Sequence, residues 1–392
     1  MTPLSEQFRG SLDRDRVIER LRTLVTADSE NPPGNEKLSA QLVAEQMEAL
    51  GLDVSLHEAV ADRPSVIGRW VGGDGPTLTF CSHIDVVPAG DPSLWERHPF
   101  SAAVEDGLMH GRGTCDAKGC CAAALEAVAL MRSAGVTPNG TLELALVADE
   151  ETMGFQGAGY LVSEGILRPD LSIVGEPTSL RVVRAQRGAC WMRVTARGKA
   201  AHGSAPERGI SAIKHMSEIV LRLEETIPDI SHELLGAPTI NVGTITGGEK
   251  VNIIPASCVI EVDRRTIPGE TDESVVSGIE EAIAKAKERF PDIDASVEIA
   301  FNAQPFEVPG DSSLVQHALA AAGEALGREV ETIGFRGASD ARFMADAGAE
   351  VILCGPGDIT LAHTAREHIV LDELAEAALV YAGAFSRILG AR

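Results

Sequence analysis

Apolar and polar residues alternate along the first half of the chain with two periods, which predicts helices and strands in turn. A helical period of apolar residues covers about 36–50 and ends at Gly51, and the apolar runs VSLHEA, SVIGRW and TLTFCSH follow it. After a helical stretch that follows Asp116, two more apolar runs end in carboxylates: TLELALVADE (141–150) and LSIVGE (171–176). Strands that alternate with helices predict an α/β domain with a mainly parallel sheet.

The spacing of apolar residues changes near residue 182. CWMRVTARG alternates apolar and polar residues with the period of a half-exposed strand, and SCVIEVDRR does the same. Helical segments lie between and after these two strands, at about 208–226 and 272–289. We therefore predict an inserted α+β domain over residues 182–295.

The α/β pattern returns in the last third of the chain. A helical period spans about 312–326, the apolar run AEVILCGPG follows it, and a final helix begins at Leu371. We predict that residues 1–181 and 296–392 are two parts of one α/β domain, separated in sequence by the insertion.

Charge and composition limit the partners and the compartment. The formal net charge of −24 disfavours nucleic acid and anionic membrane surfaces as partners. No run of about 18–20 apolar residues and no signal-peptide pattern at the start is present, and the seven cysteines form no CxxC pair. We expect reduced, buried thiols in a cytoplasmic protein that acts on a small molecule.

Several side chains of the types that can bind metals follow the predicted buried strands. Each has an ordinary explanation when taken alone: an N-cap for the aspartate in GRGTCDAKG, a solvated strand end for an acidic pair, or a loop histidine. Taken together, they are expected at the carboxyl edge of one sheet, where side chains from successive strands converge. The residues are His83, Asp85, Asp116, Glu150, Glu151, Glu176 and His363.

A mixed set of imidazoles and carboxylates suits zinc, cobalt or manganese better than ions that prefer thiolates. A carboxylate in the middle of such a set can bridge two ions. The glycine-rich turns GRGTCDAKG and VGGDG fit neither GxGxxG nor GxxxxGK[ST] after a strand, so a nucleotide-binding site is disfavoured.

Five segments in this order carry a resemblance to a known family: SHIDVVPAG, GRGTCDAKG, DEET, GEPT and AHTAREH. The chain resembles, from about Asn31 to its end, the di-zinc acylases and exopeptidases that include acetylornithine deacetylase, succinyl-diaminopimelate desuccinylase, aminoacylase and glutamate carboxypeptidase. The resemblance implies a di-metal hydrolase domain and an inserted lid through which two copies form a homodimer.

The resemblance also implies roles for the residues at the matching positions. His83 and Glu176 would hold one Zn²⁺, Glu151 and His363 would hold the other, and Asp116 would bridge them. Asp85 would support His83, and Glu150 would be the general base. Co²⁺ or Mn²⁺ can replace zinc in such a site.

The predicted lid carries further residues that the resemblance assigns to catalysis and substrate binding. His202, in GKAAHGSAPERG, would cross to the partner's active site and stabilise the oxyanion. Asn252 and Arg265, next to Arg264, would bind the substrate, and an arginine can hold a carboxylate with two parallel hydrogen bonds. Gly337 and Ser339, in FRGASDARF, would contact the substrate.

The substrate pattern is mixed. EPTSLRVVRAQRG and GPGDITLAHTAREHI are similar to acetylornithine deacetylases, which implies removal of an acetyl group from an amino acid such as N-acetylornithine. FRGASDARF is more similar to desuccinylases, yet Gln186 stands where those enzymes carry an arginine before the matched Arg187. A desuccinylase and a carboxypeptidase or dipeptidase remain alternatives. A non-catalytic metal-binding protein is disfavoured because every matched position is intact.

Overall fold

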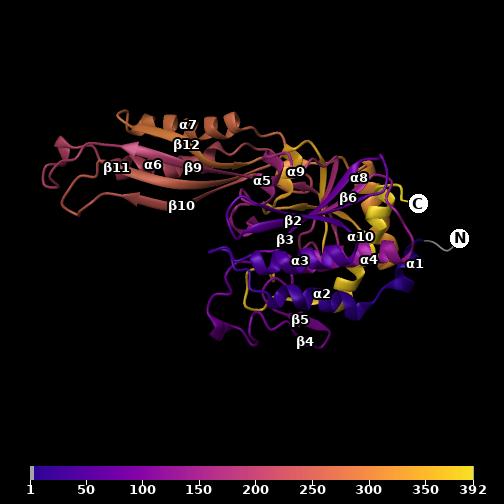
Figure 1. Ribbon diagram of the computed structural model, residues 1–392. Coiled ribbons are helices and arrows are strands. Elements are labelled where there is room, and N and C mark those ends of the chain that lie inside the picture. Colours follow the sequence, from indigo (N-terminus) through magenta and orange to yellow (C-terminus); the bar gives the residue numbers. More distant parts are fainter. Residues whose placement is uncertain (1–3, 392) are drawn as a thin grey trace. The chain divides into compact units, whose positions relative to one another are not determined.

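The computed structural model describes residues 4–391, and this part of the chain separates into two compact units. The first unit takes the chain up to Arg184, Val308–Ile333 and the part from Ser339 onward. The second unit consists of Ala185–Glu307 and the short segment Gly334–Ala338. Figure 1 shows the elements of both.

The first unit is built on a central sheet with a parallel middle. Strands β6, β3, β7 and β15 run parallel to one another, whereas β1 and β2 add an antiparallel edge. This confirms the predicted α/β class with a mainly parallel sheet. In spatial order the strands are β1 (Asp53–Glu58), β2 (Pro64–Val71), β6 (Thr141–Val147), β3 (Thr77–His83), β7 (Leu171–Val174) and β15 (Glu350–Leu353).

Helices cover both faces of this sheet. Figure 1 shows α5 and α9 on the other side of the sheet from α3 and α4. The helices of the unit are α1 (Leu4–Ser11), α2 (Arg14–Thr26), α3 (Lys37–Ala49), α4 (Lys118–Ser133), α5 (Ala158–Ser163), α8 (Ser313–Leu326), α9 (Ala341–Asp346) and α10 (Leu371–Ile388).

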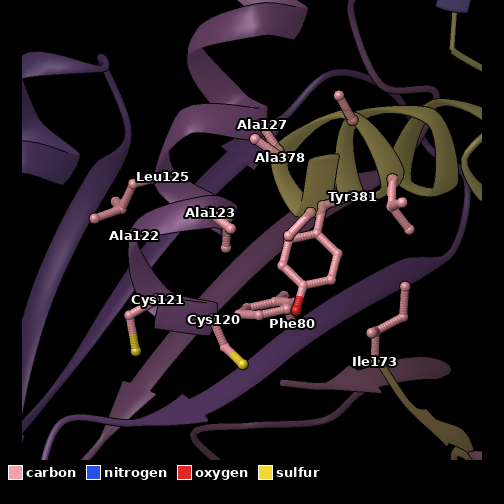
Figure 2. Close-up of a cluster of buried hydrophobic side chains, with 14 of the residues drawn as sticks. Phe80, Cys120, Cys121, Ala122, Ala123, Leu125, Ala127, Ile173, Ala378 and Tyr381 are labelled. Carbon is pink, nitrogen blue, oxygen red and sulfur yellow. The ribbon is translucent and has the colours of Figure 1, made fainter. Parts of the chain in front are cut away.

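The core of the first unit lies where α4 and α10 meet the sheet. Phe80 of β3 packs edge-on against Tyr381 of α10, with ring centroids 4.9 Å apart, and Figure 2 shows small side chains of α4 beside them. The Tyr381 hydroxyl donates to the Cys354 carbonyl at 2.7 Å, which satisfies a buried polar group. Alanines on α4 allow the helix to approach closely, so its N-terminus is fixed near the end of β3. The seven cysteines are buried free thiols, as predicted.

A small antiparallel sheet in the same unit corrects one expectation. It consists of β4 (Ala103–Glu105), β5 (Leu108–His110) and β16 (His368–Val370). Asp116 follows β5 of this sheet, so the prediction that every candidate ligand follows a strand of one sheet is wrong for Asp116. A glycine-rich loop, rather than a central strand, brings the aspartate to the N-terminus of α4.

The second unit has its own antiparallel sheet in the order β10-β11-β9-β12. The predicted alternating segments form its two central strands, and α6 and α7 pack on the buried side chains of the sheet. The elements are β9 (Gly188–Arg197), β10 (Thr239–Gly247), β11 (Ser257–Thr266), β12 (Asp294–Ala303), α6 (Ala212–Leu223) and α7 (Asp272–Arg289).

Short strands lie near the points where the chain passes between the units: β8 (Val182–Gln186), β13 (Phe306–Glu307) and β14 (Thr332–Phe335). Across residues 4–391, no helix combines the length and the apolar composition that a bilayer crossing requires.

Candidate metal centre

His83 is the last residue of β3, and its ring orientation is fixed. Nδ1 lies 2.9 Å from the main-chain oxygen of Asp85, and because a carbonyl can only accept, Nδ1 donates this hydrogen bond. Nε2 lies 3.2 Å from Asp116 Oδ1 and donates to it when the ring is protonated, and once this proton leaves, Nε2 is the free acceptor. The buried ring therefore presents a ligand nitrogen to Asp116.

Asp116 lies between the two histidines. Its Oδ1 faces His83 Nε2, and its Oδ2 lies 3.3 Å from His363 Nε2. Burial raises the pKa of Asp116, but the hydrogen bonds from His363 and His83 outweigh this effect and hold the pKa well below its usual range. Each carboxylate oxygen thus faces a different imidazole, which is the arrangement expected of a bridging ligand.

Glu151 and His363 complete this side of the centre. His363 Nε2 lies 3.1 Å from Glu151 Oε2, and Glu151 Oε1 accepts from the Val87 main-chain N–H at 3.3 Å. Hydrogen bonds to Asp116 and Glu151 raise the pKa of His363 to about 10. Ligand atoms of His83, Asp116 and Glu151 all lie within 4.8 Å of one another.

Glu150 and Glu176 add negative charge to the same region. Glu176 is almost fully buried after β7, and Glu150 begins the turn that follows β6. Burial, together with the carboxylates around them, raises the pKa of both glutamates well above the usual value. Among residues 4–391, neither forms an ion pair with a lysine or an arginine. Such carboxylates require a proton or a bound cation.

The donor set fits divalent cations of the zinc type. Ligand atoms of His83, Asp116 and Glu151 cluster in one buried region, and the two oxygens of Asp116 face different histidines. The five residues predicted as ligands all belong to the first unit.

The carboxylate of Asp85 organises the turn that carries Glu150 and Glu151. It accepts from their main-chain N–H groups at 3.3 and 3.2 Å and from Asn31 Nδ2 at 2.8 Å. The Asp85 carboxylate is 3.6 Å from His83 Nδ1, so its main-chain oxygen makes the closer contact with the ring. Burial raises the pKa of Asp85 to about 6.

Asn31, Arg112 and Glu367 also surround the centre, and the sequence interpretation did not include them. Glu367 accepts from Arg112 and from the Asp116 main-chain N–H. Burial raises the pKa of Glu367 to about 7, although Arg112 opposes this shift. The one signal in the sequence is that Glu367 follows His363 by four residues.

Of the residues predicted to stabilise the oxyanion or bind substrate, all except Ser339 lie in the second unit. His202 and Asn252 are exposed neighbours, because the Gly203 N–H donates to the Asn252 carbonyl at 2.8 Å and His202 forms a β-bridge with Ile253. Arg265 is paired with Asp263 at 3.0 Å.

Gly337 and Ser339 belong to different units. Gly337 lies in the short second-unit segment, whereas Ser339 is buried in the first unit. The Ser339 hydroxyl accepts from the Ala341 N–H at 3.3 Å, at the start of α9.

Comparison with known proteins identifies the family. The model of the peptidase family M20/M25/M40 matches residues 79–387. The chain belongs to this family. It is 34% identical over 330 residues to an acetylornithine deacetylase of Myxococcus xanthus, covering 82% of this chain and 83% of the relative. It is 31% identical over 370 residues to an acetylornithine deacetylase of Proteus mirabilis, covering 90% and 91%.

Solved structures share the fold of this M20 family member. The aminopeptidase PepT from Bacillus cereus aligns with a TM-score of 0.80 at 24% identity, covering 96% of this chain and 99% of the other. A dinuclear metal-binding M20 peptidase from Bacillus subtilis aligns with a TM-score of 0.73 at 16% identity, covering 96% and 98%. Family and relatives together make the chain a hydrolase, a metal-dependent deacylase or peptidase.

Proposed function

We propose that this M20 family member is a di-metal amide hydrolase that removes an N-acyl group from an amino acid, with N-acetylornithine as the first candidate substrate. The observation that carries this proposal is the position of Asp116, whose two oxygens face His83 and His363 separately. The acetylornithine deacetylases at 31–34% identity over most of the chain support the choice of substrate.

In this proposal His83 and Glu176 hold one ion, Glu151 and His363 hold the other, and Asp116 bridges them. Zinc is the expected ion, and cobalt or manganese can replace it. When bound, such ions polarise a carbonyl and lower the pKa of a water toward about 7. The fixed tautomer of His83 and the buried position of Asp116 supply two ligands without rearrangement.

Glu150 moves the proton in the proposed reaction. Burial raises the pKa of its carboxylate, and a base whose pKa is raised can accept a proton from water and return it to the leaving amine. Asp85 holds the main chain at Glu150 in place, so the position of the base is fixed together with that of Glu151.

Substrate recognition is assigned to residues outside the ligand set. Asn252, Arg265, Gly337 and Ser339 would contact the acyl amino acid, and Arg265 would bind its carboxylate. His202 would stabilise the oxyanion from the second copy of a cytoplasmic homodimer. The exposure of His202 and its contact with the Asn252 loop are compatible with this role.

A substrate panel tests the proposal. N-acetylornithine, other N-acetyl amino acids, N-succinyl-diaminopimelate and short dipeptides would be offered to the zinc-loaded protein at equal concentration, with the EDTA-treated protein as control. Metal-dependent deacetylation supports the proposal. A preference for the succinyl substrate or for dipeptides would replace the substrate and keep the di-metal chemistry. Equal turnover with and without metal would overturn both.

A further inference from the structure

A buried ion pair lies directly behind the bridging aspartate. Glu367 Oε2 accepts a hydrogen bond from Arg112 Nη1 at 2.5 Å, and the two side chains are 0% and 3% exposed. None of the ligand or proton-transfer roles proposed above uses this pair. The other carboxylate oxygen of Glu367, Oε1, contacts the main chain next to Asp116.

Glu367 Oε1 accepts from three main-chain N–H groups of the loop that ends at Asp116. The distances are 2.8 Å to Gly113, 3.1 Å to Cys115 and 3.2 Å to Asp116. Main-chain N–H groups that converge on one anion form a nest-like concavity, and the anion fixes the path of the main chain around it. The position of Asp116 therefore depends on a carboxylate from a distant part of the sequence.

The same pair also holds the loop of His363. Glu367 follows His363 by four residues, and Arg112 Nη1 donates to the Thr364 carbonyl at 3.4 Å. The Gly111 N–H donates to the Glu367 main-chain oxygen at 3.1 Å, which adds a further link between the two loops. The loops joined in this way carry Asp116 Oδ2 and His363 Nε2, which lie 3.3 Å apart.

We propose that Glu367, held by Arg112, is a positioning residue that sets the separation of Asp116 and His363 and thereby the affinity of the ion these two side chains share. This inference rests on the proposed di-metal centre. Groups behind metal ligands typically change metal affinity by about 10–100-fold when they are removed, because the ligands lose their orientation.

The chain offers a matched control in Glu126. Its side chain is also 0% exposed, and it is held by Arg16 and Arg20 at 2.9 and 3.1 Å. Glu126 lies in the middle of α4, and Arg16 and Arg20 donate the hydrogen bonds to its carboxylate. A glutamine at either position removes a buried negative charge that pairs with arginine. Of these two glutamates, only Glu367 contacts the loops that carry Asp116 and His363.

The test compares zinc binding to metal-stripped wild type, Glu367→Gln and Glu126→Gln by competition with a chromophoric chelator. Cobalt(II) absorption spectra provide a second readout that does not depend on activity. We expect Glu367→Gln to weaken one of the two ions about 10–100-fold, to leave the other within about threefold and to change the cobalt spectrum. Glu126→Gln should lower the melting temperature and leave both affinities and the spectrum unchanged.

Other outcomes separate the inference from the proposed function. Unchanged affinities and spectrum in a folded Glu367→Gln variant, or equal losses in both glutamine variants, would overturn the positioning role. A wild-type protein that binds no zinc would overturn the di-metal proposal as well. If Glu367→Gln does not fold, Arg112→Lys keeps the carboxylate and removes the link to Thr364. It should weaken the same ion about 3–10-fold, and no change would refute the inference.

Discussion

Two buried acidic regions of the first unit are stabilised in opposite ways. Glu126 on α4 is neutralised by Arg16 and Arg20, and Glu143 on β6 is held by Arg69 at 2.6 Å. At the metal centre the partners of the carboxylates are histidines, main-chain N–H groups and the side-chain amide of Asn31. Among residues 4–391, no lysine or arginine forms an ion pair with the residues of this set, which are Asp85, Asp116, Glu150, Glu151 and Glu176.

This difference indicates which of the two regions is suited to bind a cation. A buried carboxylate without a cation costs folding free energy, so it is stabilised by binding a proton or a metal ion. Around Glu126 and Glu143 the chain supplies the positive charge itself, and these residues serve stability. At the centre the chain supplies ligand atoms in place of charge, which is the arrangement of a cation site.

The largest effect is expected from Asp116→Ala. Removing the carboxylate between the two histidines deletes the ligand that we propose both ions share, so we expect loss of bound zinc and at least about a thousandfold loss of turnover. Metal content by mass spectrometry and the rate of deacetylation measure both losses. Retention of two ions per chain would contradict the bridging role.

Glu150→Ala should separate chemistry from metal binding. The base is absent but the proposed ligands remain, so turnover should fall about 100–10,000-fold while zinc content stays at the wild-type level. Rates at saturating substrate, measured beside metal content, test this. Normal hydrolysis by the variant would show that another residue moves the proton.

Glu126→Gln should give a moderate effect of the other kind. Leaving Arg16 and Arg20 without their carboxylate should cost roughly 2–4 kcal/mol of unfolding free energy, at the lower end because Arg16 is partly exposed. Urea unfolding and the deacetylation rate of the folded variant provide the measurement. Lost activity at unchanged stability would contradict the contrast between the two regions.

The smallest effect concerns the pH dependence of the metal-free protein. The pKa of Asp85 is raised to about 6 and that of His363 to about 10, so the folded chain binds more protons than the unfolded chain between roughly pH 4 and 6 and between roughly pH 6.5 and 10. Stability from both groups is therefore present at low pH and is lost as the pH rises through these windows.

The corresponding measurement is the melting temperature at pH 5, 7 and 9 with and without zinc. We expect the metal-free protein to lose several degrees as pH rises, and the stabilisation by zinc to increase over the same range because the metal replaces those protons. A metal-free melting temperature that rises with pH would contradict this assignment of charges.

The regular part of the fold was predictable from the sequence because its apolar periods are unambiguous. The helix predicted over 36–50 is α3, and TLTFCSH is β3, with His83 at its end. Edge strand β10 was not predicted, since most of its residues are exposed on both faces and the alternation is lost.

The centre was predictable only in part. His83, Glu151 and Glu176 end or follow strands, and local patterns place them near the sheet edge. Asn31 and Glu367 act through contacts with residues 54 and 251 positions away in the sequence, which no local period encodes. The two loops that meet at Asp116 are set by those long-range hydrogen bonds.

Calorimetric titration of zinc into the EDTA-stripped protein, in buffers of different ionisation enthalpy, tests whether this region is built for divalent cations. We expect about two ions per chain and release of protons on binding, because histidine and carboxylate protons must leave the ligand atoms. A protein that binds no zinc at this centre, or that takes up zinc without releasing protons, would contradict this expectation.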